Sequence, residues 1–209
     1  MNDPTRHLGA VTRTVSKFER DGKEIHAVVA SRTYDTTIDD LWDALTTAER
    51  IPRWLMPVEG ELKLGGRYQL KGNAGGEITQ CEPPHHLAVT WEFRGNVSWV
   101  DVTLQPRGED ATLLTLEHTA EVPPQFWEQF GPGATGVGWD LSLLGLGMHV
   151  EEGVRNAPEE SASWVASQGG KDYMRASSDA WCEAAIRDGE DPAWAREAAE
   201  RTRRFYMGE

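Results

Sequence analysis

The sequence predicts an α+β fold in which a curved antiparallel β-sheet wraps around one long C-terminal helix. Three observations lead to this prediction: a hairpin near the N-terminus, a series of short alternating strands up to about residue 120, and an apolar helix after them. Alternation of apolar and polar residues is typical of half-buried strands, whereas apolar residues three and four positions apart are typical of a helix. Two short helices are expected after the first strands, and a helical tail is expected after the long helix.

The first hairpin is predicted from residues 10–18 and 24–34. β-branched residues alternate in both runs, and the Asp21-Gly22 pair between them favours a tight turn. Residues 1–8 are expected to lie outside any regular element.

Two short helices are predicted after the hairpin. Thr36 and Thr37 can cap a helix whose Leu41 and Trp42 lie on one face. The segment 46–49, Thr-Thr-Ala-Glu, has the pattern of a capping box and opens a second short helix. The two helices are expected to form a compact corner directly after a strand.

A meander of antiparallel strands is predicted next. Turn residues separate the runs, and apolar residues alternate with polar ones, so one face of the sheet is expected to be covered. Pro123-Pro124 is expected to end the sheet. The predicted strands are 61–64, 67–70, 77–81, 87–93, 100–104 and 114–118.

The long helix is predicted over residues 136–150. Trp139, Leu143 and Leu146 recur at helical spacing, and Asp140 is expected in the first turn, where a negative charge suits the helix dipole. A helix of about fifteen residues is too short to cross a bilayer, which needs about twenty. We therefore expect this helix to be buried against protein.

Glycine residues make the long helix unusual. Gly138, Gly145 and Gly147 would each cost about 1 kcal/mol relative to alanine inside a helix. Two interpretations stay open: close packing of the helix on the sheet, which is the commoner reason, and space for a ligand beside the helix.

Composition excludes some classes of partner. The chain has 209 residues and a net charge of −13, which argues against nucleic acid and anionic membranes as partners, because both bind basic surfaces. The two cysteines, Cys81 and Cys182, lie far apart in the sequence, which suits a reducing compartment better than a disulfide framework. The N-terminus lacks an apolar signal core, so a cytoplasmic location is expected.

The chain is expected to form one domain over residues 1–155 and a helical extension over 156–209. One tail helix is predicted from about 171 to 187, and a second begins with Asp191 as N-cap and Pro192 at its first position. Their apolar faces could dock on the domain or on a second subunit, which would make a homodimer. The residues of those faces include Trp181, Ile186, Trp194 and Phe205.

Several motifs together resemble a known superfamily. They are the segments 41–50 with Trp54, 65–68, 82–92 and 114–118, and the pair Gly138-Trp139. Over residues 24–152 the chain is similar to the helix-grip fold of the START and pollen-allergen superfamily (SRPBCC). It most resembles the branch named for the C-terminal domain of the heat-shock protein 90 ATPase activator. The resemblance implies a cavity for a hydrophobic small molecule between sheet and long helix; some superfamily members are cyclases or hydrolases. It implies no catalytic residue set for this branch.

A set of mostly apolar and aromatic residues could line such a cavity, although core packing is the commoner fate of each. His118 is the most notable of them, because its alternation with Leu114 and Leu116 points it to the same side. A satisfied core histidine is favoured over a general acid or base. The candidate ligand-binding residues are Trp54, Met56, Tyr68, Trp91, Phe93, Val102, Leu116, His118, Trp139, Leu143 and Leu144.

No catalytic residue, metal site or cofactor is predicted. His85-His86 lies near Cys81, but no second ligand pair appears at a metal-site spacing, so a solvated turn is favoured. The motifs for a nucleophile elbow, a phosphate loop, a dinucleotide site and a zinc-protease helix are all absent.

The sequence is therefore compatible with three functions. The first is a non-catalytic carrier or sensor that encloses a hydrophobic small molecule. The second is a cyclase- or aromatase-like enzyme, in which His118 and Tyr68 act on an aromatic or polyketide-type substrate. The third is a chaperone- or protein-interaction module, which is less favoured because few residues precede the fold and no separate chaperone-binding domain is expected there. The ligand, the oligomeric state and the role of residues 156–209 are left open.

Overall fold

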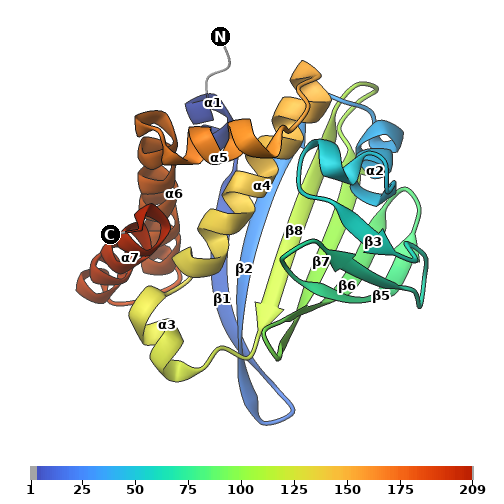
Figure 1. Ribbon diagram of the computed structural model, residues 1–209. Coiled ribbons are helices and arrows are strands. Elements are labelled where there is room, and N and C mark those ends of the chain that lie inside the picture. The colour runs from blue at the N-terminus through green and yellow to red at the C-terminus, as the bar shows by residue number, and fades with distance from the viewer. Residues whose placement is uncertain (1–3, 209) are drawn as a thin grey trace. The chain divides into compact units, whose positions relative to one another are not determined.

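The computed structural model of the chain describes residues 4–208 (Figure 1). Within that range the α+β prediction is confirmed: eight strands form one antiparallel sheet in the order β1-β2-β8-β7-β6-β5-β4-β3, and a long helix, α4, follows the last strand. The strands are β1 (Thr12–Arg20), β2 (Lys23–Tyr34), β3 (Val58–Gly60), β4 (Arg67–Leu70), β5 (Gly75–Glu82), β6 (His86–Phe93), β7 (Asn96–Pro106) and β8 (Thr112–Ala120).

The helices include those that the sequence predicts and three that it does not. The unexpected ones are α1, where residues 4–8 were expected outside any element, and α3 and α5; residues 1–3 lie outside the described range. Among the described residues, no helix combines the length and the apolar composition needed to cross a membrane. The helices are α1 (Pro4–Gly9), α2 (Ile38–Thr46), the 3-10 turn η1 (Ile51–Arg53), α3 (Pro124–Phe130), α4 (Gly133–Glu152), α5 (Pro158–Ala166), α6 (Gln168–Arg187) and α7 (Pro192–Met207).

The chain divides into two compact units. The tail unit comprises the residues up to 30, residues 121–144 and those from 158 onward, and the sheet unit comprises residues 31–120 and 145–157. β2 and α4 each continue from one unit into the other. The predicted division at residue 155 stays a prediction.

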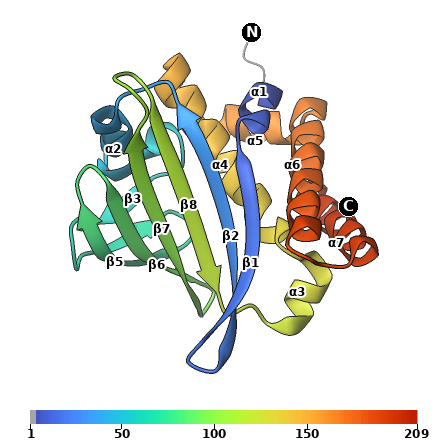
Figure 2. The same ribbon diagram turned by 180° about the vertical axis from the view of Figure 1, so that it is seen from behind.

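In the tail unit, α6 is the central helix. It contacts α1, α5, α7 and β1, and Figure 2 shows α6 and α7 side by side. The side chain of Asp191 accepts a hydrogen bond from the Trp194 amide and Pro192 begins α7, so the predicted cap is confirmed. Small side chains, among them Ala185, Ala195 and Ala199, form the buried contact between the two helices.

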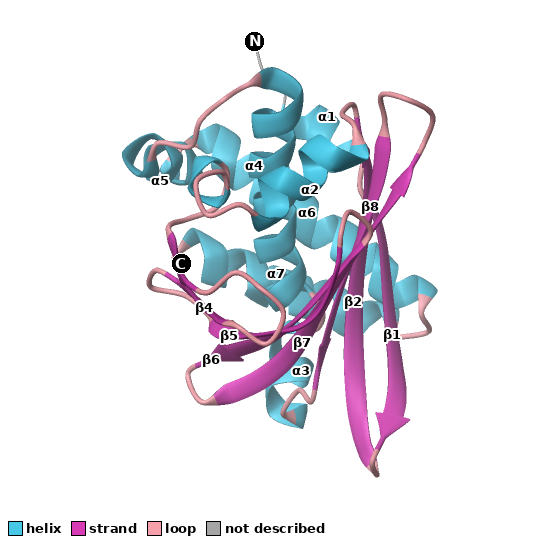
Figure 3. Cartoon of the chain, turned by 90° about the vertical axis from the view of Figure 1, so that its right-hand side faces the viewer, coloured by secondary structure: helices cyan, strands magenta, loops and turns pink. Residues whose placement is uncertain are grey.

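The strands of the sheet unit form a curved layer, visible edge-on in Figure 3. β5 pairs with β6 through an irregular register, because Ile78 lies opposite Val89 whereas Gln80 lies opposite Ala88, leaving Thr79 as an extra residue. A bulge of this kind changes which side chains of a strand point to each face.

One predicted strand is wrong. Residues 61–64 were expected to pair with 67–70, but β3 pairs with β4 instead, with Val58 opposite Leu70. The intervening stretch folds back on itself, since the Gly66 amide donates to Lys63 O and the Gly65 amide donates to Ile78 O. A Cβ on Gly66 would lie 2.1 Å from Glu61 O, so this turn requires glycine.

The predicted corner after β2 is formed as α2 and η1. The Thr37 hydroxyl accepts a hydrogen bond from the Asp40 amide, which confirms the predicted N-cap of α2. The second expected helix is only a single 3-10 turn, with Pro52 in its first positions.

The long helix begins earlier than expected. α4 starts at Gly133 rather than at residue 136, so Asp140 lies two turns inside the helix and its predicted place in the first turn is wrong. The reason is that Gly131, with φ +56°, ends α3 and lets the chain restart as a helix immediately.

Candidate functional site

The candidate site is one face of the sheet, which the strand register identifies. Val100 lies opposite both Val89 and His118, and Val102 lies opposite both Leu87 and Leu116. Because directly paired residues in antiparallel strands point to the same side, these rows form one apolar face. We define the apolar face as Tyr68, Leu87, Val89, Trp91, Phe93, Val100, Val102, Leu114, Leu116 and His118.

The apolar face is unevenly covered. Its β7 and β8 members are buried, as expected for a core. Its β6 members are not: Leu87, Val89 and Trp91 are only half-buried, and Phe93 is 40% exposed. Since β6 lies between β5 and β7, this exposure is not the result of a free sheet edge.

His118 is the polar member of the apolar face on β8. Its Nε2 lies 2.7 Å from Ser98 Oγ, and the Ser98 hydroxyl lies 3.1 Å from Trp91 O. A carbonyl oxygen can only accept, so the Ser98 proton goes to Trp91 O and His118 Nε2–H donates to Ser98. Burial lowers the pKa of His118 to about 4, and the ring is therefore neutral at pH 7.

Tyr68 reaches across β5. Its hydroxyl donates a hydrogen bond to Thr90 O on β6, at 2.8 Å, while its own pair partner on β5 is Gly76. A Cβ on Gly76 would lie 2.0 Å from Thr90 O, so the close approach of the strands there needs glycine. Burial raises the pKa of Tyr68 well above its usual range, and its proton is held in this hydrogen bond.

The corner formed by α2 and η1 places Trp54 and Met56, which are both half-buried. Trp54 Nε1–H donates to Ala44 O at 2.8 Å. A Cβ on Gly145 would lie 2.4 Å from Trp54 O, which means that Gly145 permits close packing of the corner on α4. Gly138 likewise faces the Tyr206 hydroxyl of α7, at 3.2 Å, so both glycines lie next to protein, but neither neighbour belongs to the sheet on which close packing was expected.

The remaining predicted residues belong to the tail unit. Leu143 and Leu144 are buried and Trp139 is half-buried, all on the first part of α4. Their role in lining a cavity stays a prediction. The other eight candidates all lie in the sheet unit.

A polar cluster in the sheet unit was missed by sequence reasoning. Arg50 donates to Asp40 Oδ1 at 2.6 Å and to Asp43 Oδ2 at 3.0 Å, and its Nη2 lies 3.2 Å from Nε2 of the buried His149. His149 Nδ1 lies 3.1 Å from Val154 O, so Nδ1 carries the proton and Nε2 accepts from Arg50. The cluster ties the corner to the second half of α4. No local spacing could reveal it, because Arg50 and His149 are 99 residues apart.

The tail unit contains a buried charge that sequence reasoning also missed. Arg13 Nε donates to Asp140 Oδ2 at 3.0 Å, Trp181 Nε1 donates to the same oxygen at 3.1 Å, and Ser177 Oγ donates to it as well. Tyr173 donates to the backbone oxygen of Asp140. Burial raises the pKa of Asp140, although each of the three side-chain donors favours its charged form. With every bond directed at protein, this cluster fixes α4, α6 and β1 together.

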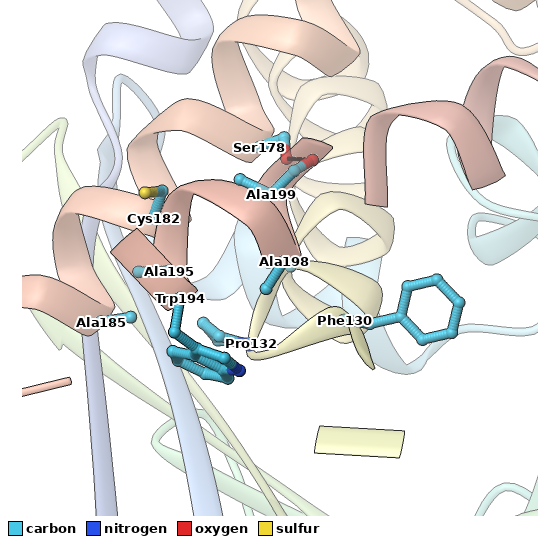
Figure 4. A pocket seen from close by; sticks show the side chains of 10 residues that line it. Phe130, Pro132, Ser178, Cys182, Ala185, Trp194, Ala195, Ala198 and Ala199 are labelled. Carbon is cyan, nitrogen blue, oxygen red and sulfur yellow. Dashed lines mark hydrogen bonds between the residues drawn. The ribbon is translucent and has the colours of Figure 1, made fainter. Parts of the chain in front are cut away.

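A small pocket in the tail unit offers little chemistry (Figure 4). Ser178 Oγ donates to Ala199 O at 2.9 Å, and burial raises the pKa of the Cys182 thiol, so neither group is activated. No charged side chain is among the pocket's lining residues, which are Phe130, Pro132, Gly133, Ser178, Cys182, Ala185, Trp194, Ala195, Ala198 and Ala199.

The two adjacent histidines are engaged separately. His86 Nε2 lies 2.8 Å from Asp101 Oδ2, on the opposite side of the sheet from the apolar face, and His85 Nδ1 lies 3.4 Å from Leu104 O. Across residues 4–208, no three side chains of His, Cys, Asp or Glu are grouped so that they could hold a metal ion.

Comparison with known proteins gives a consistent result. The family model described as activator of Hsp90 ATPase homolog 1-like protein matches residues 35–151. The crystal structure of CalU16 from Micromonospora echinospora is 31% identical with a TM-score of 0.67, over 87% of this chain and 99% of CalU16. PFC0360w, an Hsp90 activator from Plasmodium falciparum, is 26% identical with a TM-score of 0.52, over 61% of this chain and 96% of that one.

A further neighbour shares the fold alone. DynU16, a protein of the dynemicin biosynthetic locus, is 22% identical with a TM-score of 0.52, over 62% of this chain and 48% of DynU16. A search among curated proteins gave no match.

The family assignment rests on the first two matches. The family model covers more than half of the chain, and CalU16 exceeds 30% identity over most of it. Together they confirm the helix-grip fold, which is a ligand-binding fold, and the predicted superfamily branch. The chain therefore belongs to the family of activator of Hsp90 ATPase homolog 1-like proteins, within the START/SRPBCC superfamily.

Proposed function

We propose that this protein binds a hydrophobic small molecule on the apolar face and acts as a carrier or sensor rather than as an enzyme. One observation carries the proposal: Leu87, Val89 and Trp91 remain half-buried, and Phe93 is exposed, on the face whose β7 and β8 members form a core. Large apolar side chains that stay in partial contact with water mark a surface that a ligand can cover with a gain in free energy.

The chemistry of the face supports binding more than catalysis. A general base works best when its pKa lies near the working pH, and the pKa of His118, about 4, makes it a weak base at pH 7. The Tyr68 proton is held by Thr90 O. Both side chains suggested for the enzyme alternative are thus better suited to fixing geometry than to moving protons.

The test is titration with a neutral fluorescent probe, N-phenylnaphthylamine, followed by its emission. We expect saturable binding of one probe per chain. Val89→Trp, which fills the apolar face, should weaken binding by about tenfold or more, the equivalent of about 1.4 kcal/mol.

Ala88→Trp is the matched control, because Ala88 is the half-buried neighbour of Val89 and points to the opposite side of β6. It should leave the affinity unchanged. Absence of saturable binding, or equal loss in the two variants, would contradict the proposal. Native mass spectrometry of freshly purified protein would then identify any molecule that co-purifies.

The enzyme alternative has its own test. His118→Ala should abolish any conversion of an aromatic substrate if the imidazole takes part in the reaction. Turnover that survives this substitution would exclude His118 as the catalytic group, and absence of any turnover in the wild type would speak against the enzyme while leaving the binding protein in place.

The family match favours one second candidate, a role with the chaperone. PFC0360w, 26% identical, is described as an Hsp90 activator. If this chain has that role, adding it to Hsp90 should raise the chaperone's ATPase rate. An unchanged rate across a range of concentrations would remove this candidate without touching the ligand-binding proposal.

A further inference from the structure

The two sides of the sheet differ sharply in charge. In the paired rows of β5–β8 that contain the apolar face, none of the residues is Asp, Glu, Lys or Arg. The opposite rows hold all of the charged side chains of these pairs. Those are Glu82, Glu92, Asp101 and Glu117.

Two titratable groups next to the buried part of the face do not offer a charge to a ligand, whereas at its exposed end the Arg94 guanidinium lies over the Phe93 ring, 5.1 Å from the ring centroid. His118 is neutral at pH 7, because burial holds its pKa at about 4. Arg32, on the neighbouring strand β2, donates to Glu151 Oε2 at 2.7 Å, and the side chains of both are less than 10% exposed. An anionic ligand would therefore find this guanidinium already bound to a carboxylate.

Because of desolvation, a face without charges discriminates against charged ligands. A charged group moved from water to an apolar surface loses its hydration, and without a counter-charge that loss is not compensated. An uncharged molecule suffers no such loss and gains from contact with the aromatic rings of Tyr68, Trp91 and Phe93.

Building on the proposed function, we propose that the ligand of the apolar face is an uncharged, largely aromatic molecule, and that ionised amphiphiles such as carboxylates and sulfonates are rejected. The net charge of −13 acts in the same direction at long range, so the experiment must separate the two effects.

Two probes of the same shape provide the test. N-phenylnaphthylamine is neutral, and anilinonaphthalene sulfonate carries a sulfonate on the same ring system. Both are titrated at about 1 M salt, where the Debye length is only about 3 Å and long-range repulsion is screened. The neutral probe should bind about tenfold tighter or more; equal or tighter binding of the sulfonate would overturn the inference.

A pair of variants assigns the selectivity to the face. Leu87→Lys places a cation on the apolar face, and Ala88→Lys places the same cation on the opposite side of the same strand. We expect Leu87→Lys to shift the ratio of the two affinities toward the sulfonate by about tenfold, and Ala88→Lys to leave it unchanged. An equal shift in both variants would overturn the inference, since bulk charge would then explain it.

A second pair of variants, at exposed positions, keeps the test possible if the first pair does not fold. Phe93 and Val97 are 40% and 50% exposed, and Val97 pairs with Glu92 on the charged side. Phe93→Lys should shift the ratio as Leu87→Lys does, and Val97→Lys should not. Binding of neither probe to the wild type would contradict the proposed function itself, whereas equal binding of both would contradict only the selectivity.

Discussion

Two buried titratable side chains, one in each unit, have opposite surroundings. Asp140 in the tail unit is fully buried and is bonded to Arg13, Ser177 and Trp181. His118 in the sheet unit is 9% exposed, and Ser98 is its hydroxyl neighbour in a row of valines and leucines.

The difference lies in how each buried group is compensated for the loss of its hydration. A buried charge is tolerated only when protein groups replace its hydration, so the tail unit uses Asp140 to join three elements and leaves nothing for a ligand. A neutral imidazole needs far less compensation, so the sheet unit can keep one on an apolar face that is still half open. Under the proposed function, the apolar face would take the ligand, while buried ion pairs hold elements together in both units, Arg13–Asp140 in the tail unit and Arg32–Glu151 in the sheet unit.

Removing the buried charge should have the largest effect on this comparison. Asp140→Ala leaves Arg13 buried without its partner, and we expect the free energy of unfolding to fall by about 3–5 kcal/mol in urea titrations. The double variant Arg13→Met, Asp140→Leu removes both charges and should recover part of that loss. A loss below about 1 kcal/mol in the single variant would mean that the ion pair does not hold the tail unit together.

The pH dependence of His118 should come next in size. Its pKa falls from 6.5 to about 4 on folding, because burial disfavours the charged ring. The stability that the neutral ring provides is fully present above pH 6.5 and is lost as the pH falls toward 4. At about 1.4 kcal/mol per pH unit, this amounts to about 3 kcal/mol.

Urea titrations between pH 7 and pH 4 would measure it. In His118→Gln the fall in the free energy of unfolding between pH 7 and pH 4 should be smaller than in the wild type by about that amount. In His86→Gln, which removes the histidine paired with Asp101, the fall should be the same as in the wild type. Identical slopes for wild type and His118→Gln would show that the ring is solvated rather than buried.

Helix glycines should show smaller effects in both units. A Cβ at Gly136 would lie 2.2 Å from the Trp181 ring, and one at Gly145 would lie 2.4 Å from Trp54 O. We expect Gly136→Ala and Gly145→Ala each to lower the free energy of unfolding, measured by thermal unfolding, by about 1–3 kcal/mol. Gly138→Ala is the control, because a Cβ at Gly138 would meet only the Tyr206 hydroxyl, at 3.2 Å. If this variant lost as much stability as Gly136→Ala, the clash with Trp181 could not be the cause of the loss at Gly136.

Helix caps should have the smallest effects, similar in the two units. Thr37→Ala in α2 and Asp191→Ala in α7 each remove a hydrogen bond to a helix amide and should cost about 1 kcal/mol. Thr37→Ser keeps the hydroxyl and should be nearly neutral. Hydrogen exchange of the Asp40 and Trp194 amides would report each cap locally, and unchanged exchange after the alanine substitutions would contradict the assignment.

Local signals predicted most of the fold. Asp21-Gly22, the alternation in β6 to β8 and the Asp191-Pro192 start of α7 each depend on neighbours in sequence, and the structure confirms all three. The partner of β4 was predicted wrongly, because the short segments 58–60 and 61–64 compete for it, and the second folds into a turn that needs glycine at position 66, where a Cβ would lie 2.1 Å from Glu61 O.

The site was predictable only in part. Alternation correctly placed Val102, Leu116 and His118 on one side of the sheet. It could not reveal how far β6 is covered, which depends on packing between distant segments. The Arg50–His149 and Arg13–Asp140 contacts were missed for the same reason, since their partners are 99 and 127 residues apart.

The extra residue Thr79 in β5 has a consequence for the electrostatics of the sheet. Because of it, Cys81 lies opposite Leu87 and Glu82 lies opposite His86. Without this extra residue, Gln80 would lie opposite Leu87, and the Glu82 carboxylate would point to the side of the apolar face. One inserted position thus keeps an anion away from the surface on which a neutral guest is expected.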